Sequence, residues 1–134
     1  MSMLVSELMS NDVLTIGPEA PLTQASTEMR LGRVRHLPVV DAKGTLVGLL
    51  SHLDVMKAML RRKGTQVADG MSVRLVTVRE DAQAADAAKL MRSRKVGSLP
   101  VIDAKGRLVG LLTEGDFVDL AEQALRGRPL GRRD

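Results

Sequence analysis

The chain has 134 residues, of which 44% are hydrophobic and 27% charged, and this composition predicts a soluble globular domain or two half-domains that share a core. No apolar run reaches the roughly 18–20 residues that span a bilayer, and no signal-like segment opens the sequence, so we expect a cytoplasmic protein without membrane contact. Cysteine is absent, which excludes disulfides and thiolate chemistry, and the net charge of +4 invites an anionic partner. The basic residues are scattered and Phe117 is the single aromatic residue, so we do not expect nucleic acid as that partner.

The sequence repeats itself at an offset of 62 residues. Residues 5–56 match residues 67–118 without a gap, and 22 of these 52 paired positions are identical. The strongest match is LPVVDAKGTLVGLL at 37–50 against LPVIDAKGRLVGLL at 99–112. Such a strict register predicts two copies of one supersecondary unit that pack against each other.

In the first copy, a short apolar strand over residues 13–16 precedes a helix whose apolar residues share one face: Leu22, Ala25 and Met29. Strands over 37–40 and 46–50 follow, joined by an Asp-Ala-Lys-Gly turn in which Gly44 can adopt a positive φ. A closing helix carries Leu53, Met56, Met59 and Leu60 and ends near Gly64.

The second copy repeats this order, with strands over 75–78, 99–102 and 108–112, an equivalent Gly106, and a closing helix whose apolar stripe lies over 117–125. The predicted fold class is therefore α+β, with two β-α-β-β-α repeats. Repeat 1 covers 5–63, a linker 64–68, repeat 2 67–125 and a flexible basic tail 126–134. Since neither half alone buries both faces of its sheet, we expect the sheets to pack together, helices outside, about a pseudo-two-fold axis.

The junction between the last strand and the closing helix carries the chemistry. It reads Gly-Leu-Leu-Ser-His-Leu-Asp at 48–54 and Gly-Leu-Leu-Thr-Glu-Gly-Asp at 110–116. A hydroxyl three residues before an acid is a capping box, which needs no ligand. The same groups suit a nucleotide, because a helix start can hold a phosphate and a carboxylate can accept hydrogen bonds from ribose hydroxyls.

The duplicated unit, the Leu-Pro-Val strand followed by Asp, the Lys-Gly turn, the junction motif and the Met-Ser starts at 9–10 and 71–72 together resemble the CBS domain, whose tandem pair is called a Bateman module. The resemblance covers residues 5–118. With no enzyme or transporter domain attached, the chain is similar to stand-alone pairs of the acetoin-utilisation protein B type. The resemblance implies a regulatory module, not an enzyme. Such a module binds AMP, ADP, ATP or S-adenosylmethionine between the repeats and signals the occupancy of this site to a partner protein.

The resemblance also implies the site residues. The junction Asp holds the ribose and the Ser or Thr reaches the phosphate, while the opening segment and the residues before Leu-Pro come from the other repeat. One cleft would combine Thr113, Asp116 and Leu111 with Ser10, Leu14, Val34 and Arg35. The other would combine Ser51, Asp54 and Leu49 with Ser72, Val76, Val96 and Gly97.

The two clefts differ where Arg35-His36 of the first copy aligns with Gly97-Ser98 of the second. A guanidinium binds phosphate with charge-assisted, bidentate hydrogen bonds, so we expect the cleft with Arg35 and Asp116 to prefer the phosphorylated ligand. Arg35 could equally be an exposed strand-end residue. His36 is a possible pH-sensitive phosphate contact or a surface histidine, and His52 is expected to face solvent.

The sequence gives little support for a metal site or a catalytic site. The two histidines do not form a zinc motif, so we expect no metal. No nucleophile, P-loop or dinucleotide motif is present, so we expect no catalytic residues and no cofactor.

Methionines at helical spacing are expected to fill the core: Met29, Met56, Met59 and Met91. The stripes at 53–60 and 117–125 either cover the sheet or form a homodimer surface. The open alternatives are an interaction subunit with empty clefts and, with charge as its only support, nucleic-acid binding.

Overall fold

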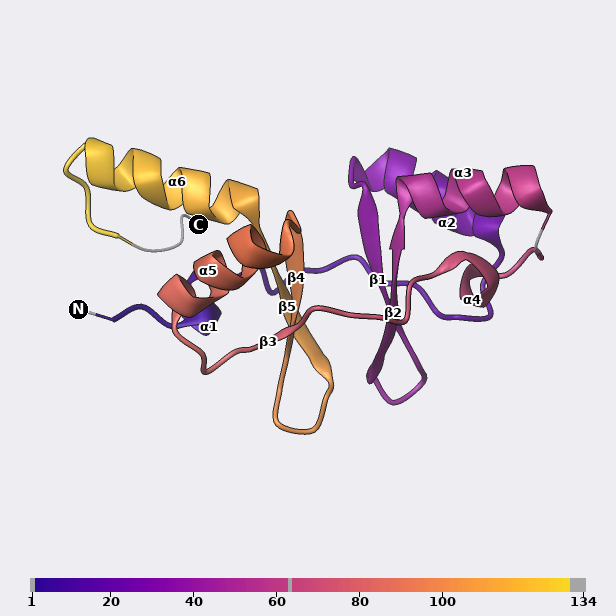
Figure 1. The fold of residues 1–134 in the computed structure, drawn as a ribbon, viewed down its shortest axis with the longest axis horizontal. Helices are drawn as coiled ribbons and strands as arrows, with labels where there is room; N and C mark the ends of the chain where they lie inside the picture. The colour runs from indigo at the N-terminus through magenta and orange to yellow at the C-terminus, as the bar shows by residue number, and fades with distance from the viewer. Residues whose placement is uncertain (1, 63, 131–134) are drawn as a thin grey trace. The chain divides into compact units, whose positions relative to one another are not determined.

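The computed structural model describes residues 2–62 and 64–130. The chain forms two compact units, which are not the two sequence repeats (Figure 1). Unit 1 consists of Met1–Val13 and Val76–Asp134, and unit 2 consists of Leu14–Leu75. Each repeat therefore gives its opening segment to the unit built by the other repeat.

Unit 2 contains α2 (Leu22–Gly32), β1 (His36–Val40), β2 (Leu46–Ser51), α3 (His52–Arg61) and α4 (Val67–Gly70). Strands β1 and β2 form an antiparallel hairpin in which His36 pairs with Ser51 and Val39 pairs with Gly48. The core collects apolar side chains from the hairpin and the helices: Ile16, Leu22, Ala25, Met29, Leu37, Val39, Leu50, Val55, Ala58 and Val67.

Unit 1 contains α1 (Val5–Leu8), β3 (Val78–Arg79), α5 (Ala84–Arg94), β4 (Ser98–Ile102), β5 (Leu108–Thr113) and α6 (Glu114–Leu125). The sheet order is β3-β4-β5, with β3 parallel and β5 antiparallel to β4. Its core repeats the pattern of unit 2: Val5, Leu8, Met9, Ala84, Ala87, Met91, Leu99, Val101 and Leu112. The α+β class and the two repeats are thus confirmed.

The first strand of each repeat is shorter than predicted. In unit 2 the segment 13–16 is reduced to a single parallel bridge between Ile16 and Val39. In unit 1 the strand continues for two residues, and Glu80 N–H then donates to Ile102 O at 3.2 Å. The residue equivalent to Glu80 is Pro18, which has no N–H to donate, and this difference stops the ladder in unit 2.

The short helices α1 and α4 are the unexpected elements. Val5 N–H donates to Ala82 O at 2.9 Å, which ties α1 to unit 1, and Val67 N–H donates to Ala20 O at 2.8 Å, which ties α4 to unit 2. The predicted linker 64–68 takes part in this packing, since Leu22 N–H donates to Thr65 O at 2.7 Å. Of the predicted boundaries and tail, residues 63 and 131–134 lie outside the described residues.

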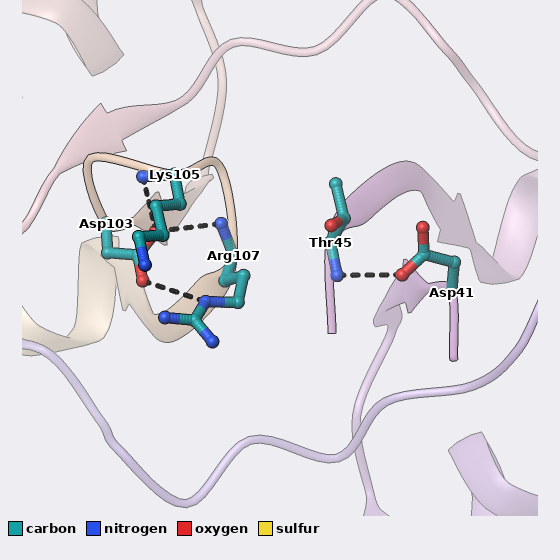
Figure 2. Close-up of polar contacts among 5 residues, drawn as sticks. All are labelled: Asp41, Thr45, Asp103, Lys105 and Arg107. Carbon is teal, nitrogen blue, oxygen red and sulfur yellow. Dashed lines mark hydrogen bonds and ion pairs between the residues drawn. The ribbon is translucent and has the colours of Figure 1, made fainter. Parts of the chain in front are cut away.

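The two hairpin turns are built around their aspartates (Figure 2). Asp41 Oδ1 accepts from Lys43 N–H and Thr45 N–H at 2.9 and 3.0 Å. Asp103 Oδ1 accepts the equivalent bonds from Lys105 N–H and Arg107 N–H at 2.8 and 3.0 Å, and Arg107 Nε adds a 3.3 Å bond to Asp103 Oδ2. Gly44 and Gly106 both have φ of 81°, as the turn predicts.

The prediction that four methionines fill the core is confirmed for two of them. Met29 and Met91 are buried, at 3% and 5% exposure, whereas Met56 and Met59 on α3 are 47% and 45% exposed. Helix α3 turns Val55 and Ala58 toward the core instead, because these residues occupy the face that meets α2 and the hairpin. Within the described residues, every helix is too short or too polar to cross a membrane.

Candidate functional site

Both strand-to-helix junctions form the hydrogen bonds of a cap. Asp54 Oδ2 accepts from Ser51 N–H at 2.9 Å, and Ser51 Oγ accepts from Asp54 N–H at 3.0 Å. In unit 1, Asp116 Oδ2 accepts from Thr113 N–H at 2.8 Å and from the Thr113 hydroxyl at 3.4 Å. The capping interpretation is therefore correct for these bonds. In the described part of the chain no group bonds the second oxygen, Oδ1, of either aspartate, so each carboxylate retains an acceptor.

The residues before Leu-Pro lie beside the junction of their own repeat. His36 pairs with Ser51 across the hairpin, and His52 N–H donates to Arg35 O at 2.8 Å. In unit 1, Ser98 pairs with Thr113 and Glu114 N–H donates to Gly97 O at 3.1 Å. The sequence predicts that Arg35 joins the Asp116 junction, and this grouping stays a prediction. Within unit 2, the hairpin register places Arg35 beside Ser51.

The opening segments lie against the last strands. Ser10 exchanges two backbone hydrogen bonds with Leu111, at 2.9 and 3.0 Å, and Ser72 exchanges two with Leu49, at 2.9 and 3.0 Å. The glycine that starts each junction motif makes this approach possible. A Cβ on Gly110 would stand 2.9 Å from Ser10 O and would also meet Met9, and a Cβ on Gly48 would meet Met71.

The predicted site residues are therefore divided between the two units. Unit 1 holds seven of them: Ser10, Val76, Val96, Gly97, Leu111, Thr113 and Asp116. Unit 2 holds the other eight: Leu14, Val34, Arg35, His36, Leu49, Ser51, Asp54 and Ser72. Nine of the fifteen are half-buried, whereas Leu14 and Val34 are 41% and 37% exposed. The half-buried residues are Ser10, Leu49, Ser51, Asp54, Val76, Val96, Leu111, Thr113 and Asp116.

Unit 2 carries a surface pocket of about 890 Å³ beside its junction. Helix α2, the start of β1 and the start of α3 line it with Ser26, Met29, Arg30, Arg33, Val34, Arg35, His36, Ser51, His52 and Leu53. We call it the basic pocket, because five of its lining residues are arginine or histidine and none is acidic. Arg30, Arg33 and His52 were not among the predicted site residues. These three residues reach one pocket because α2 ends, and α3 begins, beside the start of β1.

Unit 1 carries a smaller pocket of about 330 Å³ in the equivalent place, which we call the unit 1 pocket. It is lined by Ala88, Met91, Arg92, Val96, Glu114 and Phe117. Met91, Arg92 and Val96 are the counterparts of Met29, Arg30 and Val34 at the offset of 62. Among the described residues, no group of three or more His, Cys, Asp or Glu side chains is arranged to hold a metal ion.

The sequence profile of the CBS domain matches residues 5–61 and 66–122, which is most of the chain and both of its repeats. The chain belongs to the CBS domain family. A CBS domain-containing protein of Dictyostelium discoideum is 33% identical over 142 residues, which cover 96% of this chain and 98% of that protein. The inosine-5'-monophosphate dehydrogenase of Methanocaldococcus jannaschii is 35% identical over 84% of this chain, but the matched part is 22% of that enzyme.

Solved structures share the fold of this CBS pair. The acetoin utilization protein AcuB from Vibrio cholerae superimposes with a TM-score of 0.86 at 30% identity, covering 94% of this chain and 95% of that one. CBSX2 from Arabidopsis thaliana, solved with AMP, has a TM-score of 0.83 at 32% identity, with 92% and 98% covered. The CBS domain pair of protein MJ0100, solved with 5'-methylthioadenosine and S-adenosyl-L-methionine, has a TM-score of 0.83 at 27% identity, with 92% and 99% covered.

Proposed function

We propose that this CBS pair is a regulatory module that binds an adenosine-containing ligand, and that the basic pocket of unit 2 receives the phosphorylated end of that ligand. The observation that carries the proposal is the basic pocket itself, which lies directly beside the Ser51–Asp54 junction. Similar CBS pairs were solved with AMP and with S-adenosyl-L-methionine, and these ligands share the adenosine group.

The junction offers a suitable group for each part of a nucleotide. Asp54 Oδ2 is used by the cap, so Oδ1 is the oxygen that accepts hydrogen bonds from ribose hydroxyls. Ser51 Oγ accepts from Asp54 N–H, which leaves the hydroxyl proton to donate to a phosphate oxygen. The start of α3 adds a favourable potential for an anion.

The basic pocket supplies the charge that a phosphate needs. Arg30, Arg33 and Arg35 contribute guanidinium groups, which form bidentate hydrogen bonds with phosphate oxygens. His36 and His52 add charge when protonated. All five side chains are exposed, so we expect the affinity to fall as salt concentration rises.

We assign no catalytic step, because the enzymes that this chain resembles match it over about a fifth of their length and the site offers binding groups instead of a nucleophile with a base. Occupancy would act by changing how the CBS repeats pack against each other or against a regulated protein. A cytoplasmic location would give the pocket access to adenine nucleotides.

The exposed apolar face of α3 supports a homodimer as the assembled form. Leu53 and Leu60 are 56% and 82% exposed, next to Met56 and Met59 on the same helix. Such a row of apolar side chains on the outside of a unit favours contact with a second copy of the chain. The same row favours the alternative function, an interaction subunit whose pockets stay empty.

Calorimetric titration with AMP, ADP, ATP and S-adenosylmethionine tests the proposal. We expect AMP to bind and Arg35→Ala to weaken it about tenfold to a hundredfold, since hydrogen bonds to charged groups are among the stronger ones. Lys57→Ala is the matched control, because it removes one positive charge from an exposed position of α3 that does not line the pocket. Failure of all four ligands to bind at submillimolar concentration, with the dimer intact, would establish the interaction subunit instead.

A further inference from the structure

A further pocket of unit 1 lies at the turn of the β4-β5 hairpin and has a volume of about 430 Å³. The junction residue Thr113 pairs with Ser98 at one end of this hairpin, and the turn follows Ile102 at the other end. Residues of α1, of β3 and of the turn line the pocket, which we call the turn pocket. Its charged residues are Arg79, Glu80, Asp81, Asp103, Lys105 and Arg107.

The turn pocket is a place where the two repeats differ. The matching stretches 37–50 and 99–112 differ at two positions, and the one change of charge between them is Thr45 to Arg107. The other arginine of the pocket, Arg79, stands where unit 2 has Gly17. Both arginines are therefore particular to unit 1, and the fold that the two units share does not require them.

Each of these arginines is held by one carboxylate and keeps other donors. Arg79 Nη2 bonds Asp81 Oδ2 at 3.0 Å, and Arg107 Nε bonds Asp103 Oδ2 at 3.3 Å. The two terminal nitrogens of Arg107 have no partner among the described residues (Figure 2). The arginine side chains are 49% and 51% exposed, and ion pairs at such exposure add little stability. The pairs do restrict the direction of each guanidinium, which leaves its remaining N–H groups for a ligand.

Lys105 and Glu80 supply one further charge of each sign. Over the part of the chain that the structure describes, neither the Lys105 ammonium nor the Glu80 carboxylate has a hydrogen-bond or ion-pair partner. The backbone of Glu80 is fixed on both sides, because its N–H donates to Ile102 O at 3.2 Å and its carbonyl accepts from Ser6 N–H at 3.0 Å. A simple anion would be repelled by Glu80, and a simple cation by Lys105 and the arginines. A ligand that carries both charges satisfies all of these groups.

We propose that the turn pocket binds a free acidic amino acid, with its carboxylates on the two arginines and Lys105 and its ammonium group on Glu80. Three cationic groups with donors to spare and one unpaired carboxylate match two carboxylates and one ammonium group. Asp81 and Asp103 add no net repulsion, because each is offset by the arginine that it binds. The site lies away from both strand-to-helix junctions, so the inference does not rest on the function proposed above.

Titration of the full chain with L-glutamate, followed by calorimetry and by NMR of the backbone amides, tests the inference. Low ionic strength is needed, because salt screens exposed charges. We expect one molecule to bind per chain at about millimolar concentration or below, with the largest shifts at residues 79–81 and 103–107. Glutarate, which has the same two carboxylates without the ammonium group, should bind about tenfold more weakly or worse. Equal binding of glutarate or inorganic phosphate, or no saturable binding of glutamate, would overturn the inference.

Substitutions test the two charge contacts separately. Arg107→Thr copies unit 2, where Thr45 N–H makes the same turn bond, so the turn should persist while glutamate affinity falls about tenfold or more. Glu80→Gln should weaken glutamate without weakening glutarate. Arg126→Thr is the matched control, because Arg126 is 57% exposed and paired with Glu122 but does not line the pocket. Equal weakening by the two arginine substitutions would contradict the inference, whereas absence of AMP binding by the wild type would contradict only the proposed function.

Discussion

Met9 lies directly against Gly110: a Cβ on this glycine would stand 2.5 Å from Met9 Sδ. This contact joins the opening segment of repeat 1 to the last strand of repeat 2 within unit 1. It explains why the junction motif starts with glycine, since a larger residue would push the opening segment off the strand.

Gly110→Ala should therefore lower the free energy of unfolding by about 1–3 kcal/mol, the usual range for overpacking a buried site. Gly115→Ala is the matched control. Its Cβ would meet only Thr113 Oγ1 at 3.5 Å, and alanine is the better helix former, so we expect about 0.5–1 kcal/mol of stabilisation. Urea unfolding monitored by circular dichroism measures both variants. Equal effects of the two substitutions would show that the contact with Met9 is not tight.

The repeat in the sequence predicted the hairpins, their turns and the amphipathic helices, because each of these depends on local periodicity and on residues such as Gly44 and Gly106. It did not predict α1 and α4. Each has four residues, which is too short for a periodic pattern, and each is held by backbone hydrogen bonds to residues distant in sequence, as Val5 is by Ala82.

For the candidate site, the position of each residue along its own hairpin could be derived from the sequence, while its role in binding stays a prediction. Counting back from the turn at 41–45 pairs residue 36 with residue 51, so the position of Arg35 beside its own junction was contained in the hairpin register. The exposure of Met56 could not be read in the same way, because apolar residues lie on more than one face of α3 and packing decides which face is buried.

Asp54 has two roles that one substitution separates. In Asp54→Asn the side-chain oxygen still accepts from Ser51 N–H, so the cap persists and stability should fall by less than about 1 kcal/mol, mainly through the lost charge at the helix start. The amide that replaces Oδ1 cannot accept from a ribose hydroxyl, so AMP affinity should fall about tenfold or more. Asp54→Ala should lose both. Equal affinity of Asp54→Asn and wild type would mean that this carboxylate serves the cap alone.

The turn at Asp103 gives a prediction for acid pH. The backbone N–H of Arg107 lowers the pKa of Asp103 most, and the N–H of Lys105 and the Arg107 guanidinium lower it further (Figure 2). Because the folded pKa lies below the unfolded value of about 3.9, this carboxylate stabilises the fold above that pH. The contribution is lost as the pH falls through the folded pKa. Asp103→Asn should therefore be destabilising near pH 7 and neutral at the acid end.

A carboxyl NMR titration isolates the guanidinium. In Arg107→Thr, which copies Thr45 of the first turn, we expect the pKa of Asp103 to rise only part of the way to its ordinary value, because the backbone N–H of residue 107 remains bonded. A complete return to the ordinary value would show that the guanidinium, and not the backbone, holds the charge.

The α3 face gives a prediction for assembly. Met56 is 47% exposed beside Leu53 and Leu60, so in a homodimer that uses this face Met56→Glu would place an unpaired charge between apolar side chains. We expect light scattering after size exclusion to show a dimer for wild type and a monomer for Met56→Glu. Lys57→Glu, one position along the same helix and also exposed, is the control and should remain dimeric. Both variants should keep their helical circular dichroism, because neither side chain is buried in the core of unit 2. A monomeric wild type, or dissociation of both variants alike, would assign the dimer contact to a different surface. Since ligand occupancy is proposed to act through packing, AMP should shift the dissociation constant of the wild-type dimer, and Arg35→Ala should need about tenfold to a hundredfold more AMP for the same shift.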